Sequence, residues 1–497
     1  MTIPQWAKNR IGYQCFVDSF AIGSGTVHDK ADRYPQSVYD WQAKLLNWDQ
    51  HDEKYNWGYS FYGGDLKGVE NAVRDYLAGF GVDMLYLTPI FKAETNHKYD
   101  TTDYRQIDPQ FGTLDDFHNL LGTCHEHNVR LLLDGVFNHT GSKHPWFLNA
   151  QQGKEPFTHY YKHNENGQFL YWNGVETLPL LDHTSPDVRR ELYESPDSVV
   201  DYWLQQGADG WRLDVAEGLG QEVIRHIKTT MEQRHPEKLL IGEVMETYGK
   251  DWLGDDLLDG TMNYVFLGTT VNFLTQKIDA QEYMNELTKM YNEYPAEQLY
   301  TSWNLISSHD TDRMLFQVDG NENLFKMAVI LQFTYPGVPM IYYGDELGVL
   351  YGKKDESNRR GMDWTGAEFV KERANAPWLR PVMPMDWGRV NQYSSIHFFY
   401  KHMIWLRKSS PVLVQGEFIP LYADKTLLAY LRRHKDQLVL VVINTGHTRD
   451  VKIPIPPDIR NLHKVLRTSH GPLPAADLTG ESLEMTVYHE NAYIFTG

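Results

Sequence analysis

Through about residue 410, the chain alternates short apolar runs with longer stretches in which apolar residues recur at helical spacing. The short runs are rich in Val, Ile, Leu and aromatic residues, which is typical of buried strands. Strands are predicted at 11–20, 84–90, 129–137, 208–213, 239–244, 262–266, 300–306 and 338–343. Helices are predicted between them, for example at 66–80, 114–127, 186–205 and 323–333. Eight strands with helices between them predict an α/β fold, the (β/α)8 TIM barrel.

Two segments depart from this alternation. Residues 140–184 are too many for an ordinary loop and are rich in Gly, Asn, Tyr and Trp, so we expect a small inserted domain after the third strand. Beyond residue 411, short strand-like runs are separated by turn signals such as Asn444-Thr445-Gly446, a pattern typical of an antiparallel β-sandwich. The predicted domains are the barrel (1–139 and 185–410), the inserted domain (140–184) and a C-terminal β-sandwich (411–497).

Polar residues close several of the predicted strands. The carboxyl ends of parallel strands are where barrel enzymes gather their active sites. The segments concerned are Asp134-Gly-Val-Phe-Asn138-His139, Gly210-Trp-Arg212-Leu-Asp214, Ile241-Gly-Glu243 and Ser308-His309-Asp310. Carboxylates gathered with an Arg and two His suit cleavage of a glycosidic bond. That reaction needs an acid for the leaving oxygen and a carboxylate for the oxocarbenium-like centre.

The spacing within these segments suggests roles. Arg212 lies two residues before Asp214 on the same strand face, so its charge would keep Asp214 ionised, as a nucleophile requires. Glu243 has no cation in its own segment, so we expect the raised pKa of a general acid. Hydrogen bonds to the sugar would come from Asp310, His139 and His309.

Each residue alone has a simpler explanation. A single strand-end Asp is often a helix cap, and Arg212 with Asp214 could be a structural ion pair. A lone His at a strand end is more often a buried hydrogen-bonding residue. The joint occurrence of all these groups, in order and at strand ends, favours catalysis.

Composition narrows the function classes. The net charge of −19, from 47 Lys and Arg against 66 Asp and Glu, argues against nucleic acid or an anionic membrane as a partner. The start of the chain lacks the apolar stretch of a secretory signal, and no run approaches the ~20 apolar residues of a membrane span. Cys15 and Cys124 make no disulfide framework, so we expect a cytoplasmic protein with free thiols.

The four strand-end segments resemble the four signature regions of the α-amylase family, glycoside hydrolase family 13. The likeness extends to Asn96-His-Lys-Tyr-Asp100-Thr, Phe111-Gly-Thr and Tyr342-Tyr-Gly-Asp-Glu346. Phe61-Tyr-Gly-Gly-Asp65-Leu and Leu178-Pro-Leu-Leu-Asp182 are similar to the branch of cyclomaltodextrinases, neopullulanases and maltogenic amylases.

The resemblance implies a role for each matching residue. Asp214 would be the nucleophile, Glu243 the general acid/base and Asp310 the transition-state stabiliser. The subsite for the attacked glucose would be lined by His97, Tyr99, Asp134, His139, Arg212, His309 and Arg359, with Tyr99 stacking on the sugar.

The chain also departs from this branch. The branch usually begins with an extra β domain that often mediates dimerisation. The barrel pattern here starts almost at once, so we expect that dimer mode to be absent, and the oligomeric state stays open. Glu217-Gly218 and Met245-Glu246 stand where the branch commonly has Asn-Glu and Trp-His, so its linkage preference does not carry over.

No cofactor is expected to be required. In the branch, an early loop binds calcium through oxygen-bearing residues. In this chain the matching positions hold Ile22, Ser24, Val27 and His28, so we expect this calcium site to be lost. A different calcium site of amylase type, at Asn138, stays open. We predict no metal ligands.

The predicted function is a retaining hydrolase of short, cyclic or branched maltooligosaccharides that cleaves α-1,4 bonds, with α-1,6 bonds left open. The alternatives are an α-glucosidase, a transglycosylase or an endo-acting amylase of the same family. A non-catalytic sugar-binding protein is more remote, because all the expected carboxylates are present. Aromatic residues of the inserted segment would either wall off one side of the cleft or form a local core: Trp146, Phe147, Tyr160, Tyr161, Tyr171 and Trp172.

Overall fold

The computed structural model describes residues 3–34, 44–46, 57–352, 355–362, 364, 395–468, 476–479 and 481–497. Its central element is a closed barrel of eight strands in the order β1-β12-β11-β10-β9-β8-β7-β4. The pairings of β4 with β1 and β7, and of β8 with β7 and β9, are parallel. The strands are β1 Gly12–Cys15, β4 Met84–Leu87, β7 Arg130–Gly135, β8 Gly210–Leu213, β9 Leu239–Val244, β10 Gly260–Asn263, β11 Trp303–Asn304 and β12 Val338–Tyr342. This barrel confirms the predicted fold class.

Two apolar runs that were predicted as single strands contain a strand and a helix. The run at 11–20 ends its strand at Cys15 and continues as α1, Val17–Phe20. The run at 262–266 ends its strand at Asn263, whose side-chain oxygen accepts a hydrogen bond from the Phe266 amide and so begins α10. Short apolar runs do not distinguish buried strand from buried helix, so the hydrophobic pattern could not place either boundary.

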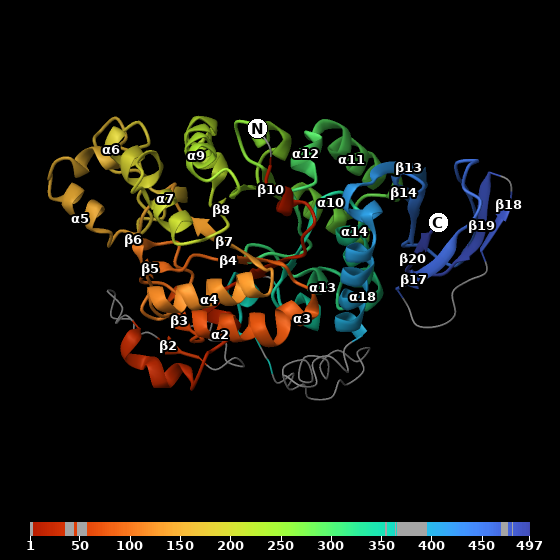
Figure 1. Ribbon diagram of the computed structural model, residues 1–497, viewed down its shortest axis with the longest axis horizontal. Coiled ribbons are helices and arrows are strands. Elements are labelled where there is room, and N and C mark those ends of the chain that lie inside the picture. Colours follow the sequence, from red (N-terminus) through yellow and green to blue (C-terminus); the bar gives the residue numbers. More distant parts are fainter. Residues whose placement is uncertain are drawn as a thin grey trace. The chain divides into compact units, whose positions relative to one another are not determined.

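Contacts divide the chain into two compact units, residues 1–262 with 359–363 and residues 263–358 with 364–497. In the first unit α2 and α4 lie side by side (Figure 1), and Thr113 and Asp116 form a capping box at the start of α4. The helices of this unit are α1, α2 Leu66–Ala72, α3 Ala78–Phe80, α4 Leu114–Glu126, α5 Pro145–Gln151, α6 Pro186–Arg189, α7 Val199–Gln205, α8 Ala216–Leu219 and α9 Gln221–Arg234. The π-helical segment Val73–Leu77 joins α2 to α3. Two small sheets pair β2 Lys44–Leu45 with β3 Ser60–Phe61, and β5 Phe91–Ala93 with β6 Thr101–Ile107.

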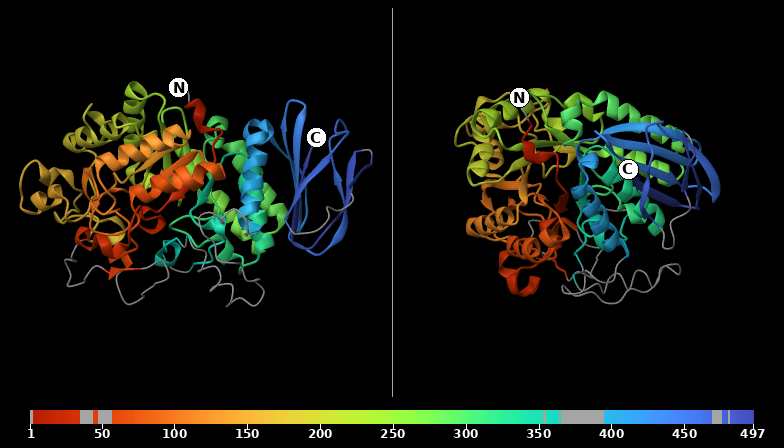
Figure 2. Two further views of the ribbon diagram at one scale, coloured as in Figure 1. Left: turned by 60° about the horizontal axis from the view of Figure 1, so that its bottom comes forward. Right: turned by 45° about the vertical axis from the view of Figure 1, so that its right-hand side comes forward.

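In the second unit, α14 and α18 lie side by side, and the C-terminal strands form two antiparallel sheets (Figures 1 and 2). The helices are α10 Tyr264–Leu274, α11 Ala280–Glu293, α12 Ala296–Leu299, α13 Met314–Gln317, α14 Glu322–Thr334, α15 Asp355–Asn358, α18 Ser395–Ser409 and α19 Pro411–Gln415. One sheet contains β13 Glu417–Ala423, β14 Leu427–His434, β15 Gln437–Asn444, β20 Asn491–Thr496 and β17 His463–Arg467. The other contains β16 Arg449–Pro454, β19 Ser482–Val487 and β18 Ala476–Thr479.

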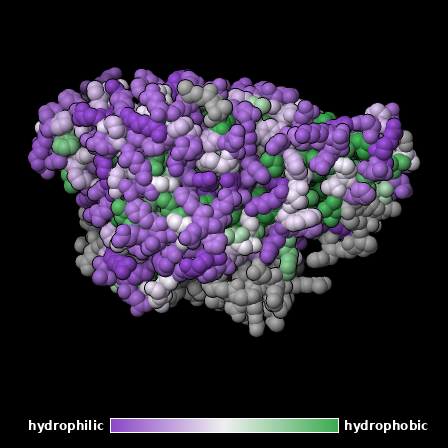
Figure 3. Space-filling model, in the orientation of Figure 1, coloured by the Kyte–Doolittle hydropathy of each residue, from purple (hydrophilic) through white to green (hydrophobic). Residues whose placement is uncertain are grey.

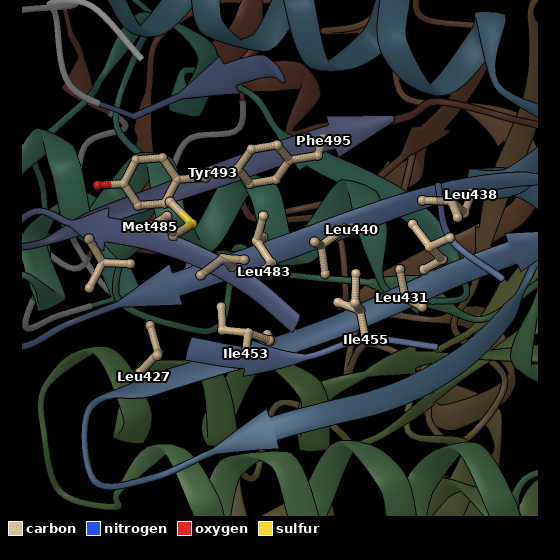
Figure 4. Close-up of a cluster of buried hydrophobic side chains, with 14 residues drawn as sticks. Leu427, Leu431, Leu438, Leu440, Ile453, Ile455, Leu483, Met485, Tyr493 and Phe495 are labelled. Carbon is tan, nitrogen blue, oxygen red and sulfur yellow. The ribbon is translucent and has the colours of Figure 1, made fainter. Parts of the chain in front are cut away.

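The two C-terminal sheets share one apolar core (Figure 4). Leu427 and Leu431 project from β14 at even spacing, as alternate residues of a strand do. Ile453 and Leu483 come from the facing sheet, and all four side chains are buried. The predicted C-terminal antiparallel β-sandwich is thus confirmed, whereas the predicted domain boundaries stay a prediction.

The described residues on the face drawn in Figure 3 are mainly hydrophilic, in keeping with the net charge of −19. Among the residues that the structure places, no helix is both long enough and apolar enough to cross a membrane.

Candidate active site

Neighbouring strands β7, β8 and β9 bring the first three strand-end segments together around one buried guanidinium. Asp134 is the register partner of Arg212, and Arg212 that of Ile241. Arg212 Nη1 lies 2.8 Å from Asp134 Oδ1 and 3.0 Å from Asp214 Oδ1, while Nη2 lies 2.7 Å from Glu243 Oε1. One cation therefore pairs with all three carboxylates, and its side chain is 0% exposed.

Glu243 has no cation in its own segment, as the sequence showed, and the raised pKa expected for it stays a prediction. A cation comes from the adjacent strand, because the long side chain of Arg212 reaches Glu243 as well as Asp214. Burial alone would lower the pKa of Arg212, but Asp134 and Glu243 raise it well above its usual value, so the guanidinium stays charged. Arg212 therefore pairs with Glu243, the expected acid, as well as with Asp214, the expected nucleophile.

A strained backbone position gives Glu243 a second partner. The amide of Val215, the residue after Asp214, donates to Glu243 Oε2 at 2.9 Å. Val215 has a φ of 47°, which is unusual for a β-branched residue and costs on the order of 1–3 kcal/mol. Such strain is found where surrounding structure enforces it, often at functional sites.

Asp134 is held by hydroxyl donors as well as by Arg212. Tyr86 and Tyr99 donate to its Oδ2 at 2.5 and 3.1 Å. Burial raises the pKa of Asp134, while Arg212 and the tyrosine hydroxyls oppose the shift. Burial also raises the pKa of Tyr99 well above its usual value, so its hydroxyl remains a donor. Asp134 thus fixes Arg212 and Tyr99 relative to each other.

The rings of Tyr99 and Trp57 contact that of His97, and a second guanidinium contacts Trp57. The His97 ring stacks on Tyr99 with centroids 5.8 Å apart, and the centroid of the Trp57 ring lies 5.2 Å from that of His97. The Arg359 guanidinium lies 4.8 Å from the centroid of Trp57, a cation–π contact. His139 Nε2 lies 3.2 Å from the Tyr99 carbonyl, and burial lowers the pKa of His139 to about 4, so this imidazole is neutral at pH 7.

In the second unit, the fourth predicted segment follows β11. His309 Nε2 lies 3.1 Å from Asp310 Oδ2, and the Asp310 amide donates to Ser308 Oγ at 3.1 Å. Ser308 is itself fixed, since its amide donates to Thr311 Oγ1 at 2.9 Å. The structure thus gathers the predicted residues in two groups, one around Arg212 and His97 in the first unit and one at His309 and Asp310 in the second.

Three residues of this region were not identified from the sequence. Trp57 carried no motif, and Tyr86 was hidden inside an apolar strand, where its polar tip was the available signal. Glu217 was noticed as a departure from the resemblance, but its contacts were not foreseen.

Glu217 holds the loop after β9 in place through hydrogen bonds. Its carboxylate accepts hydrogen bonds from the amides of Met245, Glu246 and Thr247 at 3.0, 3.0 and 2.7 Å, and from the Thr247 hydroxyl. Burial alone would raise the pKa of Glu217, but these donors lower it. A Cβ atom at position 218 would lie 3.0 Å from Asn138 Oδ1 and 2.8 Å from Val215 Cγ1. Glycine at this position therefore allows the segment after β8 to approach Asn138 closely.

The aromatic residues of the inserted segment were expected either to wall off one side of the cleft or to form a local core. Phe147, Tyr160 and Tyr161 are buried, and the Phe147 and Tyr161 rings meet edge to face at 4.9 Å, so these residues form a local core. Trp172 is partly exposed, and its ring lies 5.9 Å from that of His139.

Within the described residues, no group of three or more His, Cys, Asp or Glu side chains could hold a metal ion. Whether the protein needs a metal stays a prediction.

Comparisons with known proteins agree with this fold. The family description "Alpha amylase, catalytic domain" matches residues 14–168 and 158–416. A cyclomaltodextrinase from a Bacillus species is 35% identical over 472 residues, which cover 90% of this chain and 75% of that protein. A cyclomaltodextrinase structure superposes with a TM-score of 0.82 at 31% identity, covering 100% of this chain and 79% of its own.

A third match carries a bound sugar. It is the cyclic α-maltosyl-(1→6)-maltose hydrolase from Arthrobacter globiformis in complex with cyclic α-maltosyl-(1→6)-maltose, with a TM-score of 0.77 and 27% identity over 91% of this chain and 94% of that one. The fold and these matches define a glycoside hydrolase. The chain belongs to the α-amylase family, and it is a hydrolase of α-glucans.

Proposed function

We propose that this protein is a retaining hydrolase of short, cyclic or branched maltooligosaccharides, with α-1,4 glucosidic bonds as its main target and α-1,6 bonds as a second. The observation that carries the proposal is the cluster of Asp134, Asp214 and Glu243 around Arg212. Similarity to a cyclomaltodextrinase and to a hydrolase crystallised with a cyclic maltosyl-maltose supports the choice of small and cyclic substrates.

In the proposed reaction, Asp214 attacks the anomeric carbon while Glu243 gives a proton to the leaving oxygen. Arg212 favours the ionised form of Asp214, which is the form that attacks. Glu243 then takes a proton from the water that releases the sugar from Asp214. This chemistry uses carboxylates alone, so we propose that it needs no metal ion.

The ion pair between Arg212 and Glu243 must change during this cycle. A carboxyl group beside a cation holds its proton poorly, whereas a general acid has to be protonated when substrate is bound. Glu243 must therefore separate from Arg212 when a sugar enters, leaving Arg212 with Asp134 and Asp214.

The remaining residues would bind and position the sugar. We propose that Tyr99 stacks on the attacked glucose, and that Asp310 accepts hydrogen bonds from its hydroxyls in the transition state. Neutral His139 can donate one ring N–H to a hydroxyl while the other nitrogen serves as an acceptor. Further contacts would come from His97, His309 and Arg359.

Small substrates should be hydrolysed with a higher kcat/KM than polymeric starch. The measurement is reducing sugar released from α-cyclodextrin, maltotriose, pullulan and soluble starch at equal glucose concentration. We expect cyclodextrin and maltotriose to give the higher values, and release from pullulan would show action on a glucan that contains both α-1,4 and α-1,6 bonds. A clear advantage of starch would instead make the protein an endo-acting amylase, and longer products than the substrate would make it mainly a transglycosylase.

A further inference from the structure

Strand β9 carries Glu243 next to its last residue, and the chain leaves the barrel directly afterwards. The strand ends at Val244, and backbone amides beyond a strand end need acceptors of their own. Here the amides of residues 245–247 all donate to one side chain, that of Glu217, at distances of 2.7 to 3.0 Å. A residue of helix α8 thus fixes the backbone that follows the proposed general acid.

The two oxygens of Glu217 share these donors. Oε2 accepts hydrogen bonds from the amides of Met245 and Glu246, and Oε1 accepts them from the amide and the hydroxyl of Thr247. Burial acts to raise the pKa of Glu217, but the donors outweigh it and lower the pKa, so the group is ionised at pH 7. Only a carboxylate offers lone pairs at both oxygens, because a carboxamide of the same shape would turn its NH2 group toward two donors.

The same short segment also contacts the carboxylate of Glu243. The Val215 amide donates to Glu243 Oε2 at 2.9 Å, and Val215 has its left-handed φ of 47° as the residue that precedes α8. Bonds from the segment to its neighbours are what can maintain such strain. Residues 215 and 217 therefore hold the Glu243 region at two points, one at the carboxylate and one at the backbone that follows it.

The loop after β9 is anchored again further along. Trp252 Nε1 donates to Thr247 Oγ1 at 2.7 Å, so the hydroxyl that donates to Glu217 is itself oriented by a donor. Gln221 Nε2 donates to the carbonyl of Asp251 at 2.7 Å, which joins the start of α9 to the same loop. These bonds restrain the loop near both of its ends.

A restrained backbone matters for the proposed reaction, because Glu243 has to separate from Arg212 before it can protonate the leaving oxygen. With the amides of residues 245–247 held by Glu217, this separation is a rotation of the Glu243 side chain rather than a shift of the loop. Small errors in the position of a catalytic group cost a large part of the rate.

We propose that Glu217 is a positioning residue for the general acid, which sets the backbone from which Glu243 reaches the leaving oxygen. The inference rests on the proposed function, since it concerns the acid of the same reaction. Glu217 stands where the branch commonly has Asn, a shorter side chain with one acceptor oxygen, so this restraint does not follow from the resemblance.

The test compares two leaving groups. A sugar leaving group needs a proton from Glu243, whereas fluoride leaves α-maltosyl fluoride with little help from an acid. For Glu217→Gln, kcat/KM on maltotriose should fall about tenfold or more, because the acid is misplaced, while kcat/KM on α-maltosyl fluoride should stay within about threefold of wild type. A purely structural defect would lower both values by the same factor.

Substitutions of Thr247 test the same loop from its other partner. Thr247→Val removes the hydroxyl that donates to Glu217, so kcat/KM on maltotriose should fall about threefold, again with little change on the fluoride. Thr247→Ser keeps the hydroxyl and should behave as the wild type. The matched control is Glu222→Gln, since Glu222 is exposed in the first turn of α9, and it should leave both substrates unchanged.

Equal losses on the two substrates, or no loss on maltotriose for Glu217→Gln, would overturn the positioning role. A wild-type protein that cleaves neither substrate would instead contradict the proposed function.

Hydrogen exchange followed by mass spectrometry keeps the two separate, because it needs no turnover. The amides of residues 245–247 should exchange about tenfold faster in Glu217→Gln than in the wild type, since the variant loses acceptors for them. Equal exchange in the two proteins would show that Glu217 does not fix this loop, and it would overturn the inference whatever the activity.

Discussion

Asp214→Asn should lower kcat by about 10³-fold or more, and Glu243→Gln should do the same, because each removes a group that acts in the bond-breaking step. Neither change removes much volume, so binding of maltotriose, measured by calorimetry, should persist in both variants. The amide that replaces Asp214 can still accept a hydrogen bond from Arg212, but it cannot attack the anomeric carbon.

The matched control is Asp115→Asn, since Asp115 is exposed in the first turn of α4. It should keep wild-type kcat. If either catalytic variant retained more than about a tenth of the wild-type rate in a preparation free of contaminating enzyme, the assigned roles would be wrong.

Arg212→Met should both abolish activity and destabilise the fold. The substitution leaves Asp134, Asp214 and Glu243 buried without their shared cation, and an uncompensated buried charge costs about 3–5 kcal/mol. The free energy of unfolding, from urea denaturation followed by tryptophan fluorescence, should fall by that amount at pH 7. Arg212→Lys should recover part of it, since an ammonium group keeps the charge but lacks the planar fork that spans three partners.

The deficit of Arg212→Met should shrink as the pH falls. Burial already raises the pKa of Asp134, and without the opposing charge of Arg212 this pKa should rise further above that of the unfolded chain. A carboxyl group whose pKa is higher in the folded than in the unfolded state holds its proton more tightly when folded. Its contribution to the free energy of unfolding is therefore greatest at low pH and is lost as the pH rises. An unfolding free energy of Arg212→Met equal to that of the wild type at pH 7 would show that the cluster is not held by this cation.

Much of the fold follows from hydrophobic patterning. Strand β9, Leu239–Val244, has the predicted bounds, and the polar and turn-forming residues at 236–238 stop its apolar run at the start. The run at 11–20 could not be divided, because its residues are buried in the strand and in the helix alike. The π-helical turn Val73–Leu77 was also beyond reach, since its residues fit a regular helix equally well.

The site was predicted in its residue types and strand positions but not in its contacts. Strand ends identify which carboxylates share one edge of the barrel, and this gave Asp214 and Glu243. Sequence spacing does not show how far a long side chain reaches between strands, so the pairing of Arg212 with Glu243 was missed. The bonds from Glu217 to the loop at 245–247 were hidden for the same reason, because they join two separate barrel loops.

The stereochemistry of the first product tests the central claim most directly. Proton NMR can follow the anomeric signals during the first minutes of maltotriose hydrolysis, before mutarotation mixes the two forms. Double displacement through Asp214 inverts the anomeric carbon twice, so the α-anomer should appear first and the β-anomer only later, at the rate of mutarotation. Appearance of the β-anomer first would mean that water attacks directly in a single displacement, and it would contradict the assignment of Asp214 as nucleophile.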